Sequence, residues 1–289
     1  MLGDLAPIGA LREAFGYAFM QRALLAGVLV ALMSGLLGTF VVQRRLSFLG
    51  DGLAHAAFGG MGLGAFVVVT VGVLEAGFLR DPLWVAVPFS LLAALGIAFV
   101  RDRTELSSDT AIGVFFAVSV ALGVLFFSRI PPDADLGVNV LDLLFGSILA
   151  VRQTERVVLA VTTVVVLGAL GWAWGRLAYA TFDDELARTD GVRTRALEYL
   201  LFAAAALVVS VSAVVVGIVL MAAYLVIPAA AARLRSRSLA GTSVRAMVIG
   251  VATTVAGVLV SFLADVPTGS AIILGQAAVF VAAAVLPRP

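Results

Sequence analysis

The sequence predicts an all-α protein, a polytopic bundle of transmembrane helices. The chain of 289 residues is 62% hydrophobic, has a mean hydropathy of +1.12 and carries only 13% charged residues, whereas a soluble domain carries about a quarter. Apolar runs long enough to cross a bilayer recur along the whole chain. These runs lack the alternation of barrel strands, so helices must satisfy the backbone polar groups in lipid.

We expect about nine spans within a single transmembrane domain over residues 1–289, each an apolar run bounded by charged or turn-forming residues. The spans are expected at residues 23–42, 53–74, 83–100, 110–127, 157–175, 197–213, 215–232, 245–264 and 268–286. Residues 1–22 carry four charged side chains and no signal-peptide pattern, which predicts an interfacial helix. Residues 136–150 are too short to span and contain Asp142, which predicts a re-entrant half helix packed against protein.

The distribution of arginine indicates the orientation, because cytoplasmic loops collect basic residues. One set of loops contains Arg44, Arg45, Arg101, Arg103, Arg188, Arg193, Arg195, Arg233, Arg235, Arg237 and Arg245. The opposite loops contain Arg80, Arg129, Arg152 and Arg156. The first set is therefore predicted to be cytoplasmic, with the amino terminus outside.

Composition excludes several classes of function. The net charge is +1 and no basic cluster is interleaved with aromatic residues, so no nucleic-acid partner is expected. The absence of cysteine excludes disulfides and thiolate metal sites. All 19 basic residues are arginine, and a phosphate-binding P-loop needs a lysine. If ATP drives this protein, another subunit binds the ATP.

One ionisable pair lies at the start of the second expected span, in RRLSFLGDGLAHAAFGG, residues 44–60. His55, the only histidine, follows Asp51 by four residues, so a helix places both side chains on one face. Ionisable groups inside a span cost about 2.5–3.5 kcal/mol on insertion scales and are functional by default. Imidazole and carboxylate suit Zn²⁺, Mn²⁺ or Fe²⁺. We interpret the pair as metal ligands, completed by water, backbone carbonyls or a second copy; the alternative is a helix cap and a packing histidine.

The longest charged connection is RLAYATFDDELARTDGVRTRALEY, residues 176–199. It predicts a short amphipathic helix that stops near Asp190 and Gly191 and is formed by Phe182, Asp183, Asp184, Glu185, Leu186 and Ala187. We interpret residues 181–195 as a docking element for a partner, the alternative being an ordinary solvated loop. The second basic connection, RLRSRSLAGTSVR at 233–245, is interpreted as a positive-inside anchor.

Two further acidic residues are possible pathway groups. Asp109 lies at an expected helix start, where Ser107, Ser108 or Asp109 is expected to cap the helix. Asp142 either lines an outer vestibule or caps the half helix. A rival function, a self-sufficient secondary transporter or ion channel, would use Asp142 with the Asp51 and His55 pair as an ion relay.

An intramembrane hydrolase is disfavoured. His55, the only histidine, would have to act as the base for a serine such as Ser47, which lies on the other side of Asp51 from His55, so no orienting order is evident.

With these stretches in order, the chain resembles the membrane permease subunits of bacterial ABC importers for zinc, manganese and iron(II), over roughly residues 20–280. The matching stretches are RRLSFLGDGLAHAAFGG, DTAIGVFF, LLFGSILAV, the DGV after the acidic connection, VVGIVLMAAYLVIPAAAARL and PTGSAIIL.

The resemblance implies a permease with a type II ABC importer fold in the bacterial cytoplasmic membrane. It implies a homodimer that pairs with two cytoplasmic ATP-binding subunits and receives Mn²⁺, Zn²⁺ or Fe²⁺ from an extracytoplasmic metal-binding protein. By the same resemblance, Asp51 and His55 contact the ion and DDELARTDGV is the coupling region. Such a subunit has no permanent cofactor and is not an enzyme, because the partner hydrolyses ATP.

Overall fold

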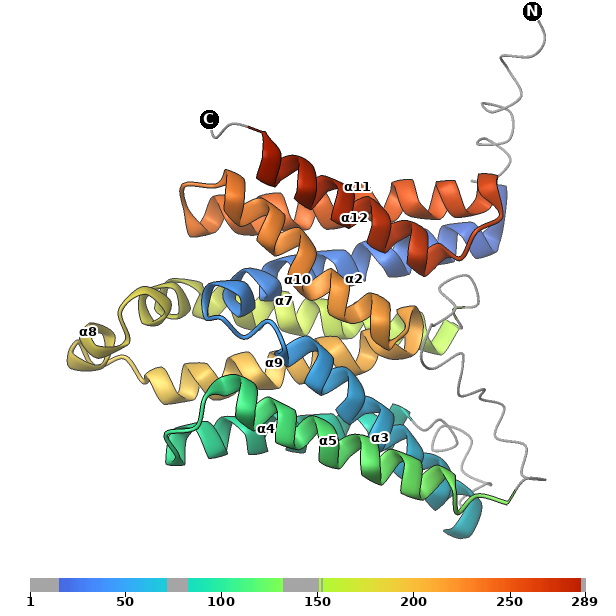
Figure 1. Ribbon diagram of the computed structural model, residues 1–289, viewed down its shortest axis with the longest axis horizontal. Helices are drawn as coiled ribbons and strands as arrows, with labels where there is room; N and C mark the ends of the chain where they lie inside the picture. Colours follow the sequence, from blue (N-terminus) through green and yellow to red (C-terminus); the bar gives the residue numbers. More distant parts are fainter. Residues whose placement is uncertain (1–15, 72–82, 132–150, 152, 287–289) are drawn as a thin grey trace, which may run out of the picture.

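The computed structural model describes residues 16–71, 83–131, 151 and 153–286 (Figure 1). Over these residues the protein is helical and has no strand. The helices are α2 (Ala18–Gln43), α3 (Leu49–Val71), α4 (Leu83–Arg103), α5 (Ser108–Phe127), α7 (Gln153–Phe182), α8 (Asp184–Thr189), α9 (Thr194–Val216), α10 (Ile218–Arg235), α11 (Leu239–Ala264) and α12 (Thr268–Val285).

In the described part of the chain, nine helices, all except α8, are long and apolar enough to cross a membrane. Each coincides with one expected span, so the predicted all-α, polytopic fold class is confirmed. The first span starts earlier than expected: α2 begins at Ala18, so residues 18–22 of the expected interfacial helix belong to it. Residues 1–15 and the expected half helix at 136–150 lie outside the described residues.

The bundle consists of two groups of helices, which are connected through α9 and through a direct contact between α3 and α10 (Figure 1). In one group α10 and α11 pack against each other and each packs against α2 and α12, and in the other α3 packs against α4 and α5. Helix α9 contacts members of both groups, and its Leu201, Ala205 and Val209 are fully buried. Helix α7 packs against α2 and α9. One hydrophobic core therefore extends through both groups.

Glycines allow α2 to lie very close to its neighbours. A Cβ atom at Gly38 would lie 2.1 Å from the backbone oxygen of Leu225 in α10. A Cβ atom at Gly35, one turn earlier, would lie 2.7 Å from the backbone nitrogen of Met247 in α11. Lipid tails are as apolar as the side chains, so close backbone contact of this kind holds membrane helices together.

Helices α9 and α10 form a hairpin whose connection is the single residue Gly217. Its φ of 87° and ψ of 155° lie in a region that essentially only glycine adopts. The chain therefore reverses without a loop, and α10 returns beside α9 toward the end of the bundle from which α9 came (Figure 1).

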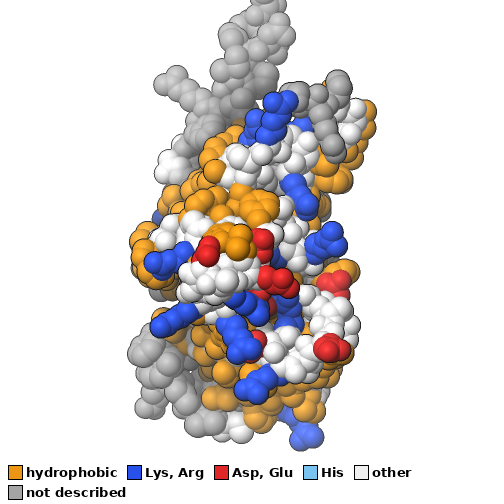
Figure 2. Space-filling model, turned by 90° about the vertical axis from the view of Figure 1, so that its left-hand side faces the viewer, with side chains coloured by type: hydrophobic (Ala, Val, Ile, Leu, Met, Phe, Trp, Pro, Cys, Tyr) orange, Lys and Arg blue, Asp and Glu red, His pale blue; other side chains and the backbone are white. Residues whose placement is uncertain are grey.

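The connections that follow α2, α4, α7 and α10 lie toward one end of the bundle, on the left in Figure 1. We call this end the arginine-rich face, because it collects Arg44, Arg45, Arg101, Arg103, Arg188, Arg193, Arg195, Arg233, Arg235, Arg237 and Arg245. Figure 2 looks onto this face and shows arginine and acidic side chains across it. The fold thus groups the loops on which the predicted orientation rests.

Candidate functional site

Asp51 and His55 lie in the first two turns of α3 and face the same side of it. His55 Nδ1 is 3.0 Å from the backbone oxygen of Asp51 and 3.6 Å from Asp51 Oδ1. With the ring proton on Nδ1, the ring donates to that carbonyl and its lone pair is on Nε2. The Asp51 side chain is 45% exposed and that of His55 is 24% exposed. The pair therefore offers carboxylate oxygens and one imidazole nitrogen to an accessible side of the helix.

Helix α5 holds the start of α3 in place. The imidazole ring of His55 contacts the ring of Phe116 in α5, with the ring centroids 4.4 Å apart. A Cβ atom at Gly52 would lie 2.5 Å from Cγ2 of Ile112, also in α5, so only glycine fits this contact without a shift. The turn that carries Asp51 is therefore tightly packed next to the carboxylate, while the carboxylate itself remains half-exposed.

The pair can bind a divalent cation only with help. Among the described residues, no group of three or more His, Cys, Asp or Glu side chains could hold a metal ion. A carboxylate and an imidazole fill two or three positions of a coordination shell, and Zn²⁺ or Mn²⁺ requires four to six. Water, backbone carbonyls or side chains of a second copy would have to supply the others.

Of the two possible pathway acids, the structure describes Asp109. Ser107, not Asp109, caps α5, because Ser107 Oγ accepts a hydrogen bond from the backbone nitrogen of Thr110 at 3.2 Å. Asp109 is exposed in the first turn of α5, where a negative charge stabilises a helix. A pathway role for Asp109 stays a prediction, and Asp142 lies outside the described residues.

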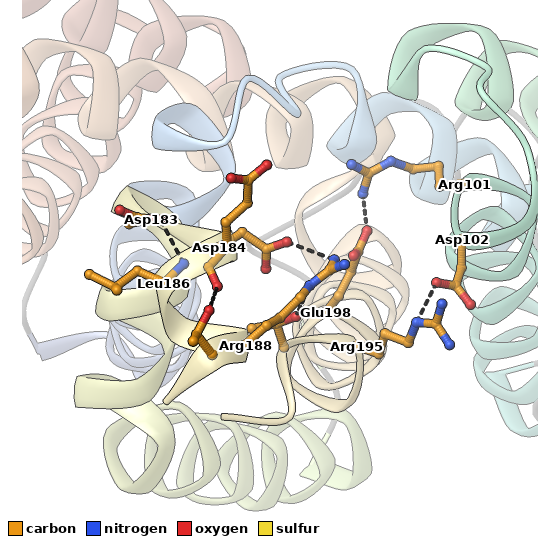
Figure 3. Close-up of polar contacts among 11 residues, drawn as sticks. Arg101, Asp102, Asp183, Asp184, Leu186, Arg188, Arg195 and Glu198 are labelled. Carbon is orange, nitrogen blue, oxygen red and sulfur yellow. Dashed lines mark hydrogen bonds and ion pairs between the residues drawn. The ribbon is translucent and has the colours of Figure 1, made fainter. Parts of the chain in front are cut away.

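The charged connection contains the short helix α8, as expected (Figure 3). Asp183 caps it, because its Oδ1 accepts a hydrogen bond from the backbone nitrogen of Leu186 at 2.9 Å. Within the helix, Arg188 Nη2 lies 2.6 Å from Asp184 Oδ2 in an i,i+4 ion pair. A cap and an internal ion pair together account for a stable helix of only two turns.

The end of α8 is tied to both neighbouring helices. Asp190 ends α8 and its Oδ2 accepts a hydrogen bond from Tyr179 Oη of α7 at 2.5 Å. Gly191 follows with a φ of 82°, which reverses the chain. Arg188 Nε donates to Thr194 Oγ1 at the start of α9, at 2.9 Å. The position of α8 is thereby fixed relative to α7 and α9.

Apolar side chains project from this connection into solvent. Phe182 is 66% exposed and Leu186 is 50% exposed, whereas Ala187 is fully buried against the bundle. Phe182 differs from expectation, because it is the last residue of α7 and not part of the short helix. The extended backbone of Asp183, with φ −147°, separates the two helices. Glu185 is exposed beside Leu186, so the outer surface of α8 combines apolar and acidic side chains.

Two ion pairs, which were not predicted from the sequence, connect the end of α4 to the start of α9 (Figure 3). Arg101 of α4 pairs with Glu198 of α9, and Asp102 Oδ1 lies 2.9 Å from Arg195 Nε. We call these four residues the α4–α9 clamp. The sequence does show a basic and an acidic residue at the end of the third expected span and again at the start of the sixth. Without the knowledge that α4 packs on α9, these charges could not be matched.

Arg44 links the end of α2 to the end of α7. Its Nε donates to Thr181 Oγ1 at 2.9 Å. Burial lowers the pKa of the Arg44 guanidinium, while the nearby carboxylates of Glu198 and Asp184 raise it. Arginine remains protonated in proteins, so a cation lies in the chain segment between α2 and the Asp51 turn.

Comparison with known proteins agrees with the fold. The ABC 3 transport family matches residues 16–286. The "Manganese transport system membrane protein MntC" of Listeria monocytogenes is 30% identical over 264 residues, covering 91% of this chain and 89% of that protein. The "High-affinity zinc uptake system membrane protein ZnuB" of Haemophilus influenzae is 28% identical over 265 residues, covering 92% and 96%. The solved structure "PsaBC from Streptococcus pneumoniae in complex with Fab" superposes with a TM-score of 0.80 at 29% identity, covering 98% of this chain and 96% of that one.

Proposed function

Because this chain belongs to the ABC 3 transport family, we propose that it is the permease subunit of an ATP-driven importer for a divalent transition metal. It is a multi-pass protein of the bacterial cell membrane. Relatives named for manganese and zinc transport support this class of cargo. Fe²⁺ fits the same imidazole and carboxylate ligands.

The observation that carries the proposal is the pair of Asp51 and His55, with both side chains accessible on one face of α3. A second copy related by a two-fold axis would bring another carboxylate and another imidazole, so a homodimer completes the shell. Such a site binds loosely enough to release its ion, as a transport pathway requires. The metal is the cargo, and the chain performs no covalent chemistry.

The arginine-rich face is proposed to be cytoplasmic and to receive the ATP-binding subunit at residues 181–195. The chain contains no lysine, so it carries no ordinary P-loop and ATP must bind elsewhere. Exposed Phe182 and Leu186 supply apolar anchors for the partner. An extracytoplasmic metal-binding protein would deliver the ion at the opposite end.

A continuous series of helix contacts connects the docking element to α3, which carries Asp51 and His55. Helix α8 contacts α7 and α9, the start of α9 is clamped to α4, and α4 packs against α3. A displacement of α8 by the ATPase would therefore shift α9 and α4 together. Access to the Asp51 and His55 pair would then alternate between the two membrane faces.

The test is ATP-dependent uptake of radiolabelled Mn²⁺, Zn²⁺ and Fe²⁺ by cells that express the whole complex. Asp51→Asn keeps the shape of the side chain, His55→Gln keeps a polar side chain, and each replaces a strong ligand by a neutral amide, so uptake should fall at least about tenfold. Asp265→Asn is the matched control, because Asp265 is exposed with a left-handed φ of 51° that asparagine also tolerates. Normal uptake by both site variants, at normal membrane levels, would refute the assignment.

The same complex distinguishes this function from a secondary transporter or channel that uses Asp51, His55 and Asp142. Reconstituted in liposomes, the permease alone should move no metal. Transport should appear only with the ATP-binding subunit and ATP. Metal flux through the permease alone would favour the rival.

A further inference from the structure

A cavity of about 550 Å³ opens on the arginine-rich face, where the ends of α2 and α10 meet α12. Its polar wall consists of Arg233, Arg235, Ser236 and Arg237, which come from the end of α10 and the connection to α11. Its apolar wall includes Val42 of α2, Ala230 of α10 and Phe280 of α12. One hollow therefore combines a strongly cationic side with a hydrocarbon side.

The positive charge of the polar wall is concentrated. The three arginines fall within five consecutive residues, and the described residues that line the cavity include no aspartate or glutamate. A fourth cation, Arg245 of α11, donates from Nη1 to the backbone oxygen of Arg235 and lies 3.3 Å from Ser236 Oγ. In the upper part of Figure 2, where α10 connects to α11, blue side chains show without red ones. Such a concentration of one sign attracts an anion.

Arg233 is anchored at the rim of the cavity by a bond to a backbone carbonyl. Arg233 Nη1 donates to the backbone oxygen of Val42 at 3.3 Å, and Arg235 Nη1 lies 3.5 Å from the backbone oxygen of Leu286. A guanidinium has five donors in a planar fork, and this fork matches the geometry of phosphate oxygens. One bond to a carbonyl anchors the Arg233 side chain at the rim and leaves donors for a ligand.

The depth and shape of the cavity favour a phospholipid over a free phosphate ion as its ligand. The arginines lie at the ends of spans, which is where lipid head groups lie. Phe280 is 37% exposed on α12, a helix with few buried residues, so acyl chains can reach the apolar wall. A free phosphate ion would use only the polar wall, whereas a phospholipid fills both.

We propose that this cavity is a binding site for the head-group phosphate of an anionic phospholipid, with the acyl chains along Val42 and Phe280. Basic pockets between transmembrane helices on the cytoplasmic side bind such head groups in other membrane proteins. The proposal does not depend on the metal site, which lies in the other group of helices.

The test uses the full-length chain in nanodiscs of phosphatidylcholine with increasing phosphatidylglycerol. Native mass spectrometry counts the phosphatidylglycerol retained, and thermal unfolding measures stabilisation. The triple variant Arg233→Gln/Arg235→Gln/Arg237→Gln removes the polar wall. Each arginine near a membrane surface contributes about fivefold to the binding of anionic lipid, so the triple variant should bind phosphatidylglycerol about 100-fold more weakly.

The matched control is Arg45→Gln/Arg103→Gln/Arg193→Gln, which removes the same charge from the same face outside the cavity. It should keep its lipid. Equal loss in both triple variants, or no loss in the cavity variant, would overturn the proposal, because bulk surface charge would then explain binding.

Two further experiments distinguish a lipid phosphate from a free phosphate ion and provide a control in case the triple variant misfolds. Inorganic phosphate added to pure phosphatidylcholine nanodiscs should not stabilise the protein. Equal stabilisation by phosphate, abolished by the cavity variant, would assign the site to a free anion and overturn the lipid proposal. If the triple variant does not fold, the single variants Arg233→Gln and Arg237→Gln should each lose lipid about fivefold, and unchanged retention in both would count against the site.

Discussion

The two ion pairs of the α4–α9 clamp differ in exposure, and exposure sets how much each stabilises the fold. The side chains of Arg101 and Glu198 are 25% and 26% exposed, whereas those of Asp102 and Arg195 are 21% and 70% exposed. An ion pair with a largely solvated partner contributes about 0.2–1 kcal/mol. A hydrogen bond to a charged group contributes about 1.5–3 kcal/mol. We therefore expect a coupling energy of about 1.5 kcal/mol for the inner pair and below about 1 kcal/mol for the outer pair.

Double-mutant cycles measure these two energies by equilibrium unfolding of the purified chain. The inner cycle uses Arg101→Gln and Glu198→Gln. Arg101 also lies over the ring of Phe202, 5.5 Å from its centroid, so a single variant loses two contacts and only the cycle isolates the pair. The outer cycle uses Asp102→Asn and Arg195→Gln and is the matched control on the same two helices.

The salt dependence of the two coupling energies tests the difference between the inner and the outer pair independently. At 1 M salt the screening length is about 3 Å, and exposed pairs are screened much more than partly buried ones. The outer coupling should vanish while the inner coupling persists. Equal coupling energies at low salt, or an inner coupling that disappears together with the outer one, would show that exposure does not rank these pairs.

Three other changes test the structure directly. Gly38→Ala places a methyl group 2.1 Å from a backbone oxygen of α10 and should cost at least about 1–3 kcal/mol in an unfolding assay. Gly171→Ala, with nothing within 4 Å, should not destabilise the protein. Leu186→Asp should abolish co-purification of the ATP-binding subunit, whereas Leu106→Asp, the same change at an exposed leucine outside residues 181–195, should preserve it. Asp183→Ala removes the α8 cap and should lower metal-stimulated ATP hydrolysis by the complex, whereas Asp183→Ser retains the cap and the activity.

Span positions could be predicted because the bilayer imposes length and polarity on each segment. Helix ends could not be predicted with the same success, since hydropathy marks only the part of a helix that lies in hydrocarbon. Helix α7 illustrates this limit: the apolar run predicted residues 157–175, but the helix extends over Gln153–Phe182. It stops where Asp183 adopts an extended backbone and caps the next helix instead.

Local spacing also predicted that Asp51 and His55 share a face, because four residues make about one helical turn. It could not show that Phe116 contacts the imidazole or that Ile112 packs against Gly52, since both lie more than 50 residues away on α5. These contacts hold the start of α3 in position, and they depend on which helices pack together. The same reason hid the partners of Arg101 and Arg195.

The arginines of the arginine-rich face all contribute to the charge bias that predicts the orientation, but they bind different partners in the folded protein. Arg101, Arg188 and Arg195 form ion pairs with carboxylates and thereby stabilise α8 or hold helices together. Arg233 and Arg245 bond to backbone carbonyls beside the cavity, where a paired carboxylate would compete with an anionic ligand. A loop such as RLRSRSLAGTSVR satisfies the positive-inside rule in either case. The proposed binding of a phospholipid by this loop therefore follows only from the cavity that α2, α10 and α12 form around it.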